Sequence, residues 1–285
     1  MRAARFGGDL LLPLALSELG QRIVFIGGLH RSGTTPLAKW LAAHPDVSGL
    51  TGTRVYEDEG QHLQSVYPVA KAHGGPGRFA LDPAARLTED SELLTGDAAQ
   101  RLVEAWAPYW DTSKPVLLEK SPPNLIRMRF LRALFPSARF IVVVRHPIAV
   151  SFATRKWSGT TIDSLLGHWL RAHEHLVEDS LHVGRTALVR YEDLLADPHS
   201  ELDRLFAFLS LPPHAGDWGV QAGLNEAYFS HFTSPRWPWR RREYARVAAA
   251  HERDVARFGY SLLDPRSLLP LQPEIAQLVP SPRVG

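Results

Sequence analysis

The chain contains no cysteine and only two methionines. Without thiols it forms no disulfide bond and holds no metal ion through thiolates, and this composition fits a reducing compartment. We therefore expect a cytoplasmic protein. A marked excess of one charge is also missing, because 32 basic and 30 acidic residues give a formal net charge of +2. This balance gives no indication of nucleic-acid binding.

Long apolar runs are absent as well. The apolar run near the N-terminus, residues 10–16, is short and is interrupted by Pro13. Because a membrane-spanning helix needs about 20 apolar residues, we expect no membrane span. The residues that follow lead directly into a second apolar run, so we predict a packed N-terminal helix or hairpin arm.

The length is sufficient for one large domain. The 285 residues are 45% apolar and 22% charged, as in an ordinary soluble globular protein. We predict a single domain over residues 1–285, with its core at about 22–210. Residues 226–242, rich in Trp, Pro and Arg, are predicted to form a loop over the site. The proline-rich residues 262–285 are predicted to be a loosely held tail.

A glycine loop follows the first apolar run. Residues 22–26 are predicted to form a buried strand, and Gly28 and Gly33 have the spacing of a phosphate-binding loop. A helix is expected to begin at Thr34, with Pro36 in its first turn. The backbone N–H groups and the helix dipole at such a junction bind anions.

This loop departs from that of nucleotide triphosphatases. Those enzymes have Lys and then Ser or Thr after the second glycine, whereas Thr34 and Thr35 stand here and Arg31 lies inside the loop. The change suits a ligand that presents a single phosphate with a group attached to it. A P-loop kinase or nucleotide hydrolase is the alternative interpretation.

Further strands and helices alternate along the chain. Helices are predicted over residues 97–110 and 165–181, and strands over 47–50, 116–119, 139–144 and 186–189. This order predicts an α/β, P-loop-like three-layer fold with a central parallel sheet and helices on both faces. Ligands bind at the carboxyl ends of such strands, where Arg31, Lys120, Arg145 and Tyr191 are expected.

The segment Arg31-Ser32-Gly33-Thr34-Thr35 resembles the 5′-phosphosulfate loop of sulfotransferases, whose donor is 3′-phosphoadenosine 5′-phosphosulfate. The following Leu41-Ala-Ala-His-Pro-Asp-Val47 resembles the tyrosylprotein and heparan sulfotransferases and their bacterial relatives. With the later matches, the resemblance covers roughly residues 22–210. It implies that the five loop residues bind this donor.

The resemblance also implies a site for the donor's 3′-phosphate. Arg145 matches the arginine of the family pattern, but Ala153 stands where the family has a serine, so that either Ser151 or another basic group takes that role. Tyr191 matches a tyrosine that lies near the adenine. The family's basic C-terminal loop falls at residues 236–242, where one of the arginines is a further candidate.

Sulfuryl transfer requires cations that face the transferring group. Arg31 and Lys120 are the candidates, and Lys120 matches a lysine of tyrosylprotein sulfotransferases. A sulfuryl group carries less charge than a phosphoryl group, so we expect no metal ion. The third predicted strand also ends in Arg145 and offers no aspartate of the Walker-B type.

A general base is also needed to accept the proton of the acceptor hydroxyl. The positions of the family's bases hold Thr51 or Gly52 and Pro122, which take up no proton at neutral pH. The nearest titratable groups follow soon after, and we rank them Glu59, Glu57 and then His62, with Asp58 beside them. If this segment is helical, Glu59 and His62 share one face.

The resemblance thus implies a sulfotransferase that acts on a hydroxyl of a small molecule, lipid, glycan or peptide. The sequence does not choose among these acceptors. A non-catalytic nucleotide-binding module that has kept the loop and lost the base is a further alternative, because Ala153 departs from the family pattern.

Overall fold

The computed structural model describes residues 18–219 and 223–280. The arm predicted at residues 10–16 lies outside them. No helix of these two ranges is long and apolar enough to cross a bilayer.

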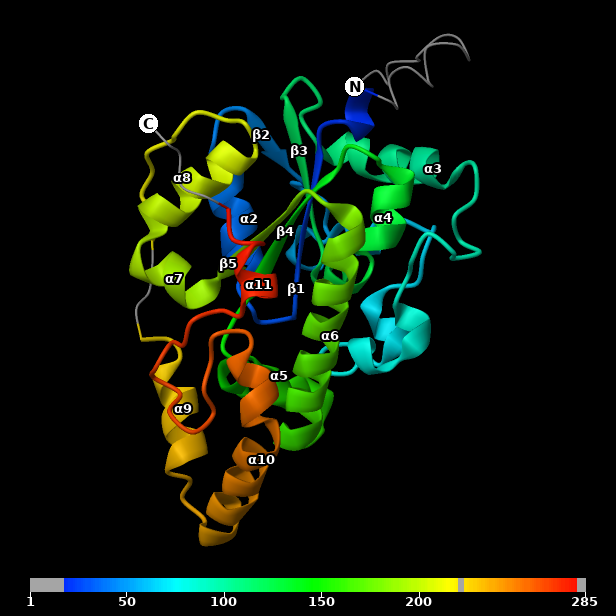
Figure 1. Cartoon of the computed structure of the whole chain (residues 1–285). Coiled ribbons are helices and arrows are strands. Elements are labelled where there is room, and N and C mark those ends of the chain that lie inside the picture. The colour runs from blue at the N-terminus through cyan, green and yellow to red at the C-terminus, as the bar shows by residue number, and fades with distance from the viewer. Residues whose placement is uncertain (1–17, 220–222, 281–285) are drawn as a thin grey trace.

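A five-stranded parallel sheet forms the centre of the molecule (Figure 1). Its strands, in spatial order, are β2 (Val47–Gly49), β3 (Val116–Lys120), β1 (Ile23–Gly28), β4 (Arg139–Val144) and β5 (Thr186–Arg190). Apolar residues run almost without interruption through β1, β3 and β4 because both faces of the sheet are covered. The predicted strands are confirmed, and β1 extends into the glycine loop.

Helices cover both faces of the sheet, which confirms the predicted three-layer α/β fold. On the left in Figure 1 lie α2 (Thr34–Ala42), α7 (Tyr191–Ala196) and α8 (Pro198–Phe208). On the right lie α3 (Ala98–Trp106), α4 (Met128–Leu134) and α6 (Ile162–Val183).

Alternate residues of each strand enter separate cores. Phe25 of β1 packs 5.6 Å from Phe140 of β4 and 5.9 Å from Trp106 of α3, measured between ring centroids. The next residue, Ile26, belongs to the core of the opposite face, together with Leu37 of α2. The two-residue period of a strand therefore fixes the sheet between its helical layers. Because all five strands are parallel, their carboxyl ends lie at one edge of the sheet.

The segment predicted as a loop at 226–242 is helical, so that prediction is wrong. It comprises α9 (Glu226–Thr233) and the start of α10 (Pro238–Ala256). These helices pack beside α5 (Pro147–Ser158), which follows β4. Pro238 occupies the first turn of α10, where a missing N–H is tolerated.

The tail predicted to be loosely held is packed from residue 262 to residue 280. Leu262, Ile275 and Leu278 are buried, and α11 (Pro273–Ala276) contains one of them. The carbonyl of Leu278 accepts a hydrogen bond of 2.7 Å from the backbone N–H of Leu188 in β5. The tail thus covers the outer edge of that strand, and its few apolar residues are enough to anchor it.

Candidate active site

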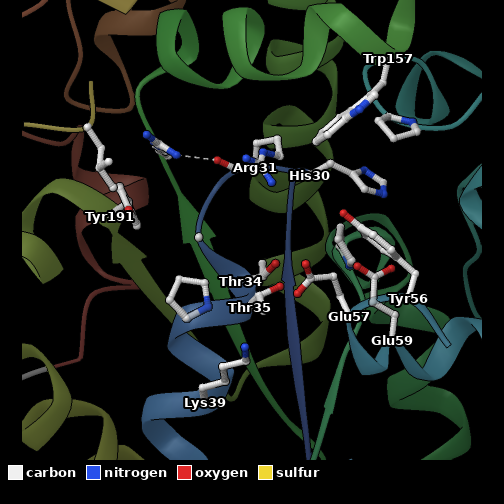
Figure 2. Close-up of a pocket in the computed structure, with 16 residues that line it drawn as sticks. His30, Arg31, Thr34, Thr35, Lys39, Tyr56, Glu57, Glu59, Trp157 and Tyr191 are labelled. Atoms are coloured by element: carbon white, nitrogen blue, oxygen red, sulfur yellow. Dashed lines mark hydrogen bonds between the residues drawn. The ribbon is translucent and has the colours of Figure 1, made fainter. Parts of the chain in front are cut away.

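A pocket of about 610 Å³ opens at the carboxyl ends of β1, β3 and β4. It combines the glycine loop, the start of α2 and the segment after β2 (Figure 2). Figure 2 shows Tyr191 on one side of the loop and Tyr56, Glu57 and Glu59 on the other. The pocket therefore has two chemically different sides.

The glycine loop is shaped by two residues with positive φ angles. Gly33 has φ 105°, and a Cβ atom there would lie 2.4 Å from the ring of Tyr191, so only glycine fits. Arg31 has φ 70°, an uncommon conformation for a residue with a side chain. The first N–H groups of α2 have no intrahelical acceptor. Thr34 and Thr35 line the pocket at this point, so the free N–H groups of the first turn of α2 are available to an anion in the pocket.

Arg145 is a buried cation on the Tyr191 side. Its guanidinium donates hydrogen bonds to the Arg31 carbonyl at 2.9 Å and to Asn225 Oδ1 at 3.0 and 2.6 Å, and it lies 4.5 Å from the Tyr191 ring centroid. None of these partners carries a negative charge, and no ion pair joins Arg145 to another part of residues 18–219 or 223–280. Burial lowers the pKa of Arg145 below its usual range. The Glu192 carboxylate is linked to the guanidinium only through the Asn225 amide. A buried guanidinium without a direct ion pair can take up an anion.

Asn225 belongs to a network that the sequence does not reveal. Its Nδ2 donates to Glu192 Oε1 at 2.7 Å, and Glu192 Oε2 accepts from the Tyr260 hydroxyl at 2.8 Å. In the Tyr-Glu-Asp element, Asp193 pairs instead with Arg190 at 2.7 Å. The network holds Arg145 in place from a part of the chain far away in sequence.

Glu59 and Lys120 form the centre of the other side. Lys120 Nζ lies 3.3 Å from Glu59 Oε1 and donates to the Glu57 carbonyl at 2.8 Å. Glu59 Oε2 accepts from Gln61 Nε2 at 2.6 Å, and His62 Nε2 is 3.6 Å away. Both members of the central pair are buried, yet Glu59 lines the pocket.

The segment carrying these acids is not an α-helix. It consists of two 3₁₀ turns, Tyr56–Asp58 and Gly60–His62, and Glu57 within the first turn has φ 53°. The predicted proximity of Glu59 and His62 is confirmed, although the helical reason given for it is wrong. Asp58 accepts hydrogen bonds of 2.5 and 3.2 Å from Thr53 and closes the turn.

Lys120 borders an adjoining crevice and not the main pocket. This crevice, of about 150 Å³, shares Thr35, Lys39 and Glu57 with the pocket. Arg31 does line the pocket, and its guanidinium carbon lies 5.0 Å from the Trp157 ring centroid. The two predicted cations therefore approach the loop from different sides.

Two predicted donor ligands are directed elsewhere. Ser32 is 1% exposed and does not line the pocket. Ser151 is also 1% exposed, and it borders a closed crevice beside His168. Residues 236–242 contribute nothing to the pocket lining either. The side chains beside Arg145 are those of Asn225 and Tyr191, whereas the sequence suggested a serine there.

Sequence reasoning missed several residues of the pocket. His30 lines it directly before Arg31, and burial lowers the pKa of His30 to about 3, so this imidazole is neutral. Lys39, Tyr56 and Trp157 also line it, and Tyr56 is 64% exposed. Of these residues, only His30 could have been found from the sequence, because it lies inside the glycine loop.

Sequence reasoning also missed Glu119, a carboxyl group close to the Glu59–Lys120 pair. Its oxygens accept from Ser121 Oγ at 2.6 Å and from Asn124 Nδ2 at 2.5 Å. Complete burial raises the pKa of Glu119 to about 7. Ser121 Oγ in turn accepts from the Gln61 backbone N–H at 2.9 Å, so this group fixes the turn that carries Glu59.

In the part of the chain that the structure describes, no three His, Asp or Glu side chains are grouped so as to hold a metal ion. The groups that face the pocket are suited instead to an anionic organic ligand: backbone N–H groups, a buried guanidinium and an aromatic ring.

Comparison with known proteins identifies relatives of this chain. A model described as the sulfotransferase family matches residues 23–215. Protein-tyrosine sulfotransferase 1 of Danio rerio is 30% identical over 218 residues, which cover 73% of this chain and 58% of the relative. Protein-tyrosine sulfotransferase 2 of Gallus gallus is 30% identical over 202 residues, or 66% and 51%. The chain thus spans about half the length of these relatives.

A solved structure shares the fold. The sulfotransferase of Mycobacterium avium superposes with a TM-score of 0.53 at 14% identity, covering 86% of this chain and 78% of the other. The similarity includes the parallel sheet and its helical layers.

Proposed function

The chain belongs to the sulfotransferase family, and we propose that it transfers a sulfuryl group from 3′-phosphoadenosine 5′-phosphosulfate to a hydroxyl group of an acceptor. The donor supplies the activated sulfuryl group. The protein contributes binding, orientation, electrostatic stabilisation and a proton acceptor.

The environment of Arg145 is the observation that carries this proposal. A buried guanidinium without a direct ion pair lies beside a loop suited to anions, so a ligand with negative charge at two separate places would fit this site. A nucleotide with a 5′-phosphosulfate and a 3′-phosphate does so. The ring of Tyr191, between the loop and Arg145, offers a surface for the adenine.

Glu59 is the proposed general base. In the proposed reaction its carboxylate takes the proton of the acceptor hydroxyl while the acceptor oxygen forms a bond to sulfur. The bond between sulfur and the phosphate oxygen breaks, and 3′,5′-bisphosphoadenosine leaves with that electron pair. Gln61 and Lys120 hold the carboxylate by contacts of 2.6 and 3.3 Å, which fix its orientation.

Arg31 and Lys120 are the proposed cations for the transferring group. Arg31 extends over the pocket beside Trp157, and Lys120 approaches through the adjoining crevice. Lys120 is held by Glu59 and by the Glu57 carbonyl before the reaction begins, so that little reorganisation of this cation is needed when charge develops on the sulfuryl oxygens. Lys39 adds a third cation at the same rim.

A ring-bearing hydroxyl is the acceptor class that the lining favours. Tyr56 and Trp157 present exposed rings at the pocket, 64% and 47% exposed. Because the relatives are named protein-tyrosine sulfotransferases, a tyrosine phenol is the first acceptor to test.

Two measurements test the proposal. Calorimetry without magnesium should detect binding of 3′,5′-bisphosphoadenosine and weak binding of ATP. Labelled donor should then transfer its sulfuryl group to a tyrosine peptide or to another hydroxylated compound of a panel. Tighter, magnesium-dependent ATP binding would instead support the kinase or hydrolase alternative. Bisphosphate binding without transfer to any member of the panel would support a non-catalytic module.

A further inference from the structure

The turn between α9 and α10 projects from the body of the molecule. In Figure 1 this hairpin tip, residues 234–242, is the lowest point of the view, beyond the carboxyl ends of the strands. Its sequence is Ser-Pro-Arg-Trp-Pro-Trp-Arg-Arg-Arg. The tip lies at the same end of the molecule as the pocket but lines no part of it.

Aromatic residues of the hairpin divide into two groups. Near its base, Phe232 and Tyr244 stack 5.1 Å apart and both contact Phe152 of α5. At the tip, Trp237 and Trp239 are 55% and 56% exposed. The hairpin therefore buries aromatic rings where it packs against α5, whereas the rings of Trp237 and Trp239 remain about half exposed and add less burial to the stability of the free protein.

Arginines surround these two tryptophans. Arg236 lies 5.4 Å from the Trp237 ring, and Arg240 lies 4.3 Å from the Trp239 ring. Arg240 is paired with Glu243, whereas Arg236, Arg241 and Arg242 are exposed and form no ion pair within the described parts of the chain.

The positive charge of this arginine run is placed unfavourably for α10. No acidic residue occupies the first turn of α10, and three successive arginines lie near its positive end. The helix dipole disfavours cations there. Exposed tryptophans and unneutralised arginines thus form one projecting surface that lacks a partner of opposite charge and apolar character.

We propose that the hairpin tip binds the surface of a membrane that contains anionic lipids. Tryptophan rings favour the boundary between headgroups and acyl chains, and arginines pair with lipid phosphates beside them. The prolines at 235 and 238 stiffen the turn, so that little conformational freedom is lost on binding. Attachment at the tip would hold the pocket's end of the molecule toward the membrane.

The shape and charge of the molecule favour a membrane over nucleic acid. The chain as a whole carries a formal net charge of only +2. Arg236, Arg241 and Arg242, which form no ion pair within the described parts of the chain, lie together at the hairpin tip. A small projection with two exposed rings suits shallow insertion into a headgroup layer, whereas nucleic acid requires a basic groove or face.

Sedimentation with lipid vesicles tests the proposal. The full chain should bind phosphatidylcholine vesicles containing about a third phosphatidylserine and not vesicles of phosphatidylcholine alone, with weaker binding at high salt. Changing Arg236, Arg241 and Arg242 together to Ser should lower partitioning on the order of a hundredfold. Trp237→Ala with Trp239→Ala should also weaken it, and should remove quenching of tryptophan fluorescence by brominated lipids.

Matched variants separate the tip from general effects. A triple variant with the same loss of charge elsewhere on the surface should bind vesicles like the unchanged protein; it replaces Lys71, Arg171 and Arg253 by Ser. Leu181→Ala is the corresponding control for the tryptophans, since Leu181 is 73% exposed on α6.

Several outcomes would overturn the proposal. They are absence of vesicle binding, equal binding by the tip variants, and binding to neutral and anionic vesicles alike. Loss of bisphosphate binding in the arginine variant would assign these residues to the donor site. Self-association that the tryptophan variant abolishes would assign the tip to a second copy of the chain, and tight binding to single-stranded DNA would assign it to nucleic acid.

Discussion

The ammonium nitrogen of Lys120 lies 3.3 Å from Oε1 of Glu59, and each side chain is only 5% exposed. Each buried charge therefore depends on the other for compensation, and removing either leaves the other unpaired. The proposed base and one proposed cation form a single unit. Substitutions there are expected to be strongly non-additive.

Replacement of the proposed base should separate chemistry from binding. We expect Glu59→Gln to lower turnover by about two to four orders of magnitude, because a glutamine amide cannot take the proton of the acceptor hydroxyl. Binding of 3′,5′-bisphosphoadenosine should stay intact by calorimetry. Glu57→Gln is the matched control, since Glu57 lines the same pocket with an exposed side chain, and its loss should be smaller. A greater loss for Glu57→Gln would transfer the role to that residue.

Arg31→Ala should lower turnover by on the order of a hundredfold or more while donor affinity falls less, because Arg31 faces charge that develops during transfer. Arg31→Lys keeps the positive charge and should retain more of the turnover. Single-turnover kinetics with separately measured donor affinity checks this result. An unchanged turnover with only a higher KM would limit Arg31 to ground-state binding.

Arg145→Ala should weaken 3′,5′-bisphosphoadenosine roughly ten- to a hundredfold, as expected for a charge-assisted hydrogen bond of about 1.5–3 kcal/mol. Adenosine 5′-monophosphate, which lacks the 3′-phosphate, should lose much less. Asn225→Ala removes the amide that holds the guanidinium and should cause a smaller loss in the same direction. Equal losses for both nucleotides would remove Arg145 from the 3′-phosphate site.

Acid should destabilise the fold through buried histidines. Burial lowers the pKa of His173 to about 4 and that of His168 to about 3. In the unfolded chain these histidines bind protons from about pH 6.5 downward, whereas in the folded chain they do not. The free energy of unfolding is therefore unaffected by them above pH 6.5 and decreases as the pH falls from 6.5 toward 4. Each costs about 1.4 kcal/mol per pH unit in that window.

Urea unfolding at several pH values measures this slope. His173→Gln should reduce the slope below pH 6.5 by about one proton, or about 1.4 kcal/mol per pH unit. His182→Gln changes an exposed histidine of the same helix and should leave the slope unchanged. An unaltered slope in His173→Gln would show that His173 takes up its proton in the folded state.

The sheet could be predicted because its strands carry their own signals. Runs such as Phe140–Val144 combine apolar and β-branched residues, and a glycine loop or a proline marks the next element. The same logic correctly placed Arg31, Lys120, Arg145 and Tyr191 at one edge of the sheet. Local sequence determines these features, so local reasoning recovers them.

The rest depends on contacts between distant residues. Nothing near Asn225 indicates that its amide holds Arg145, 80 residues earlier. The Trp, Pro and Arg residues suggested a loop over 226–242, but Pro238 begins a helix whose later residues Tyr244 and Val247 are buried. Ser121 and Asn124, which donate to Glu119, are near it in sequence. The long-range contact of this group is the hydrogen bond from the Gln61 N–H to Ser121 Oγ, across 60 residues, and nothing in the sequence indicates it.

The hydrogen-bond network of Asn225, Glu192 and Tyr260 limits how far this chain can be truncated from its C-terminus without changing the surroundings of Arg145. The segment matched by the family model ends at residue 215, before Asn225, before Tyr260 and before the carbonyl that caps β5. A chain truncated there would keep the glycine loop, Lys120, Arg145 and Tyr191 but would lose the residues that hold its buried guanidinium in place. The residues that position the buried guanidinium of Arg145 therefore extend beyond the segment by which the family is recognised.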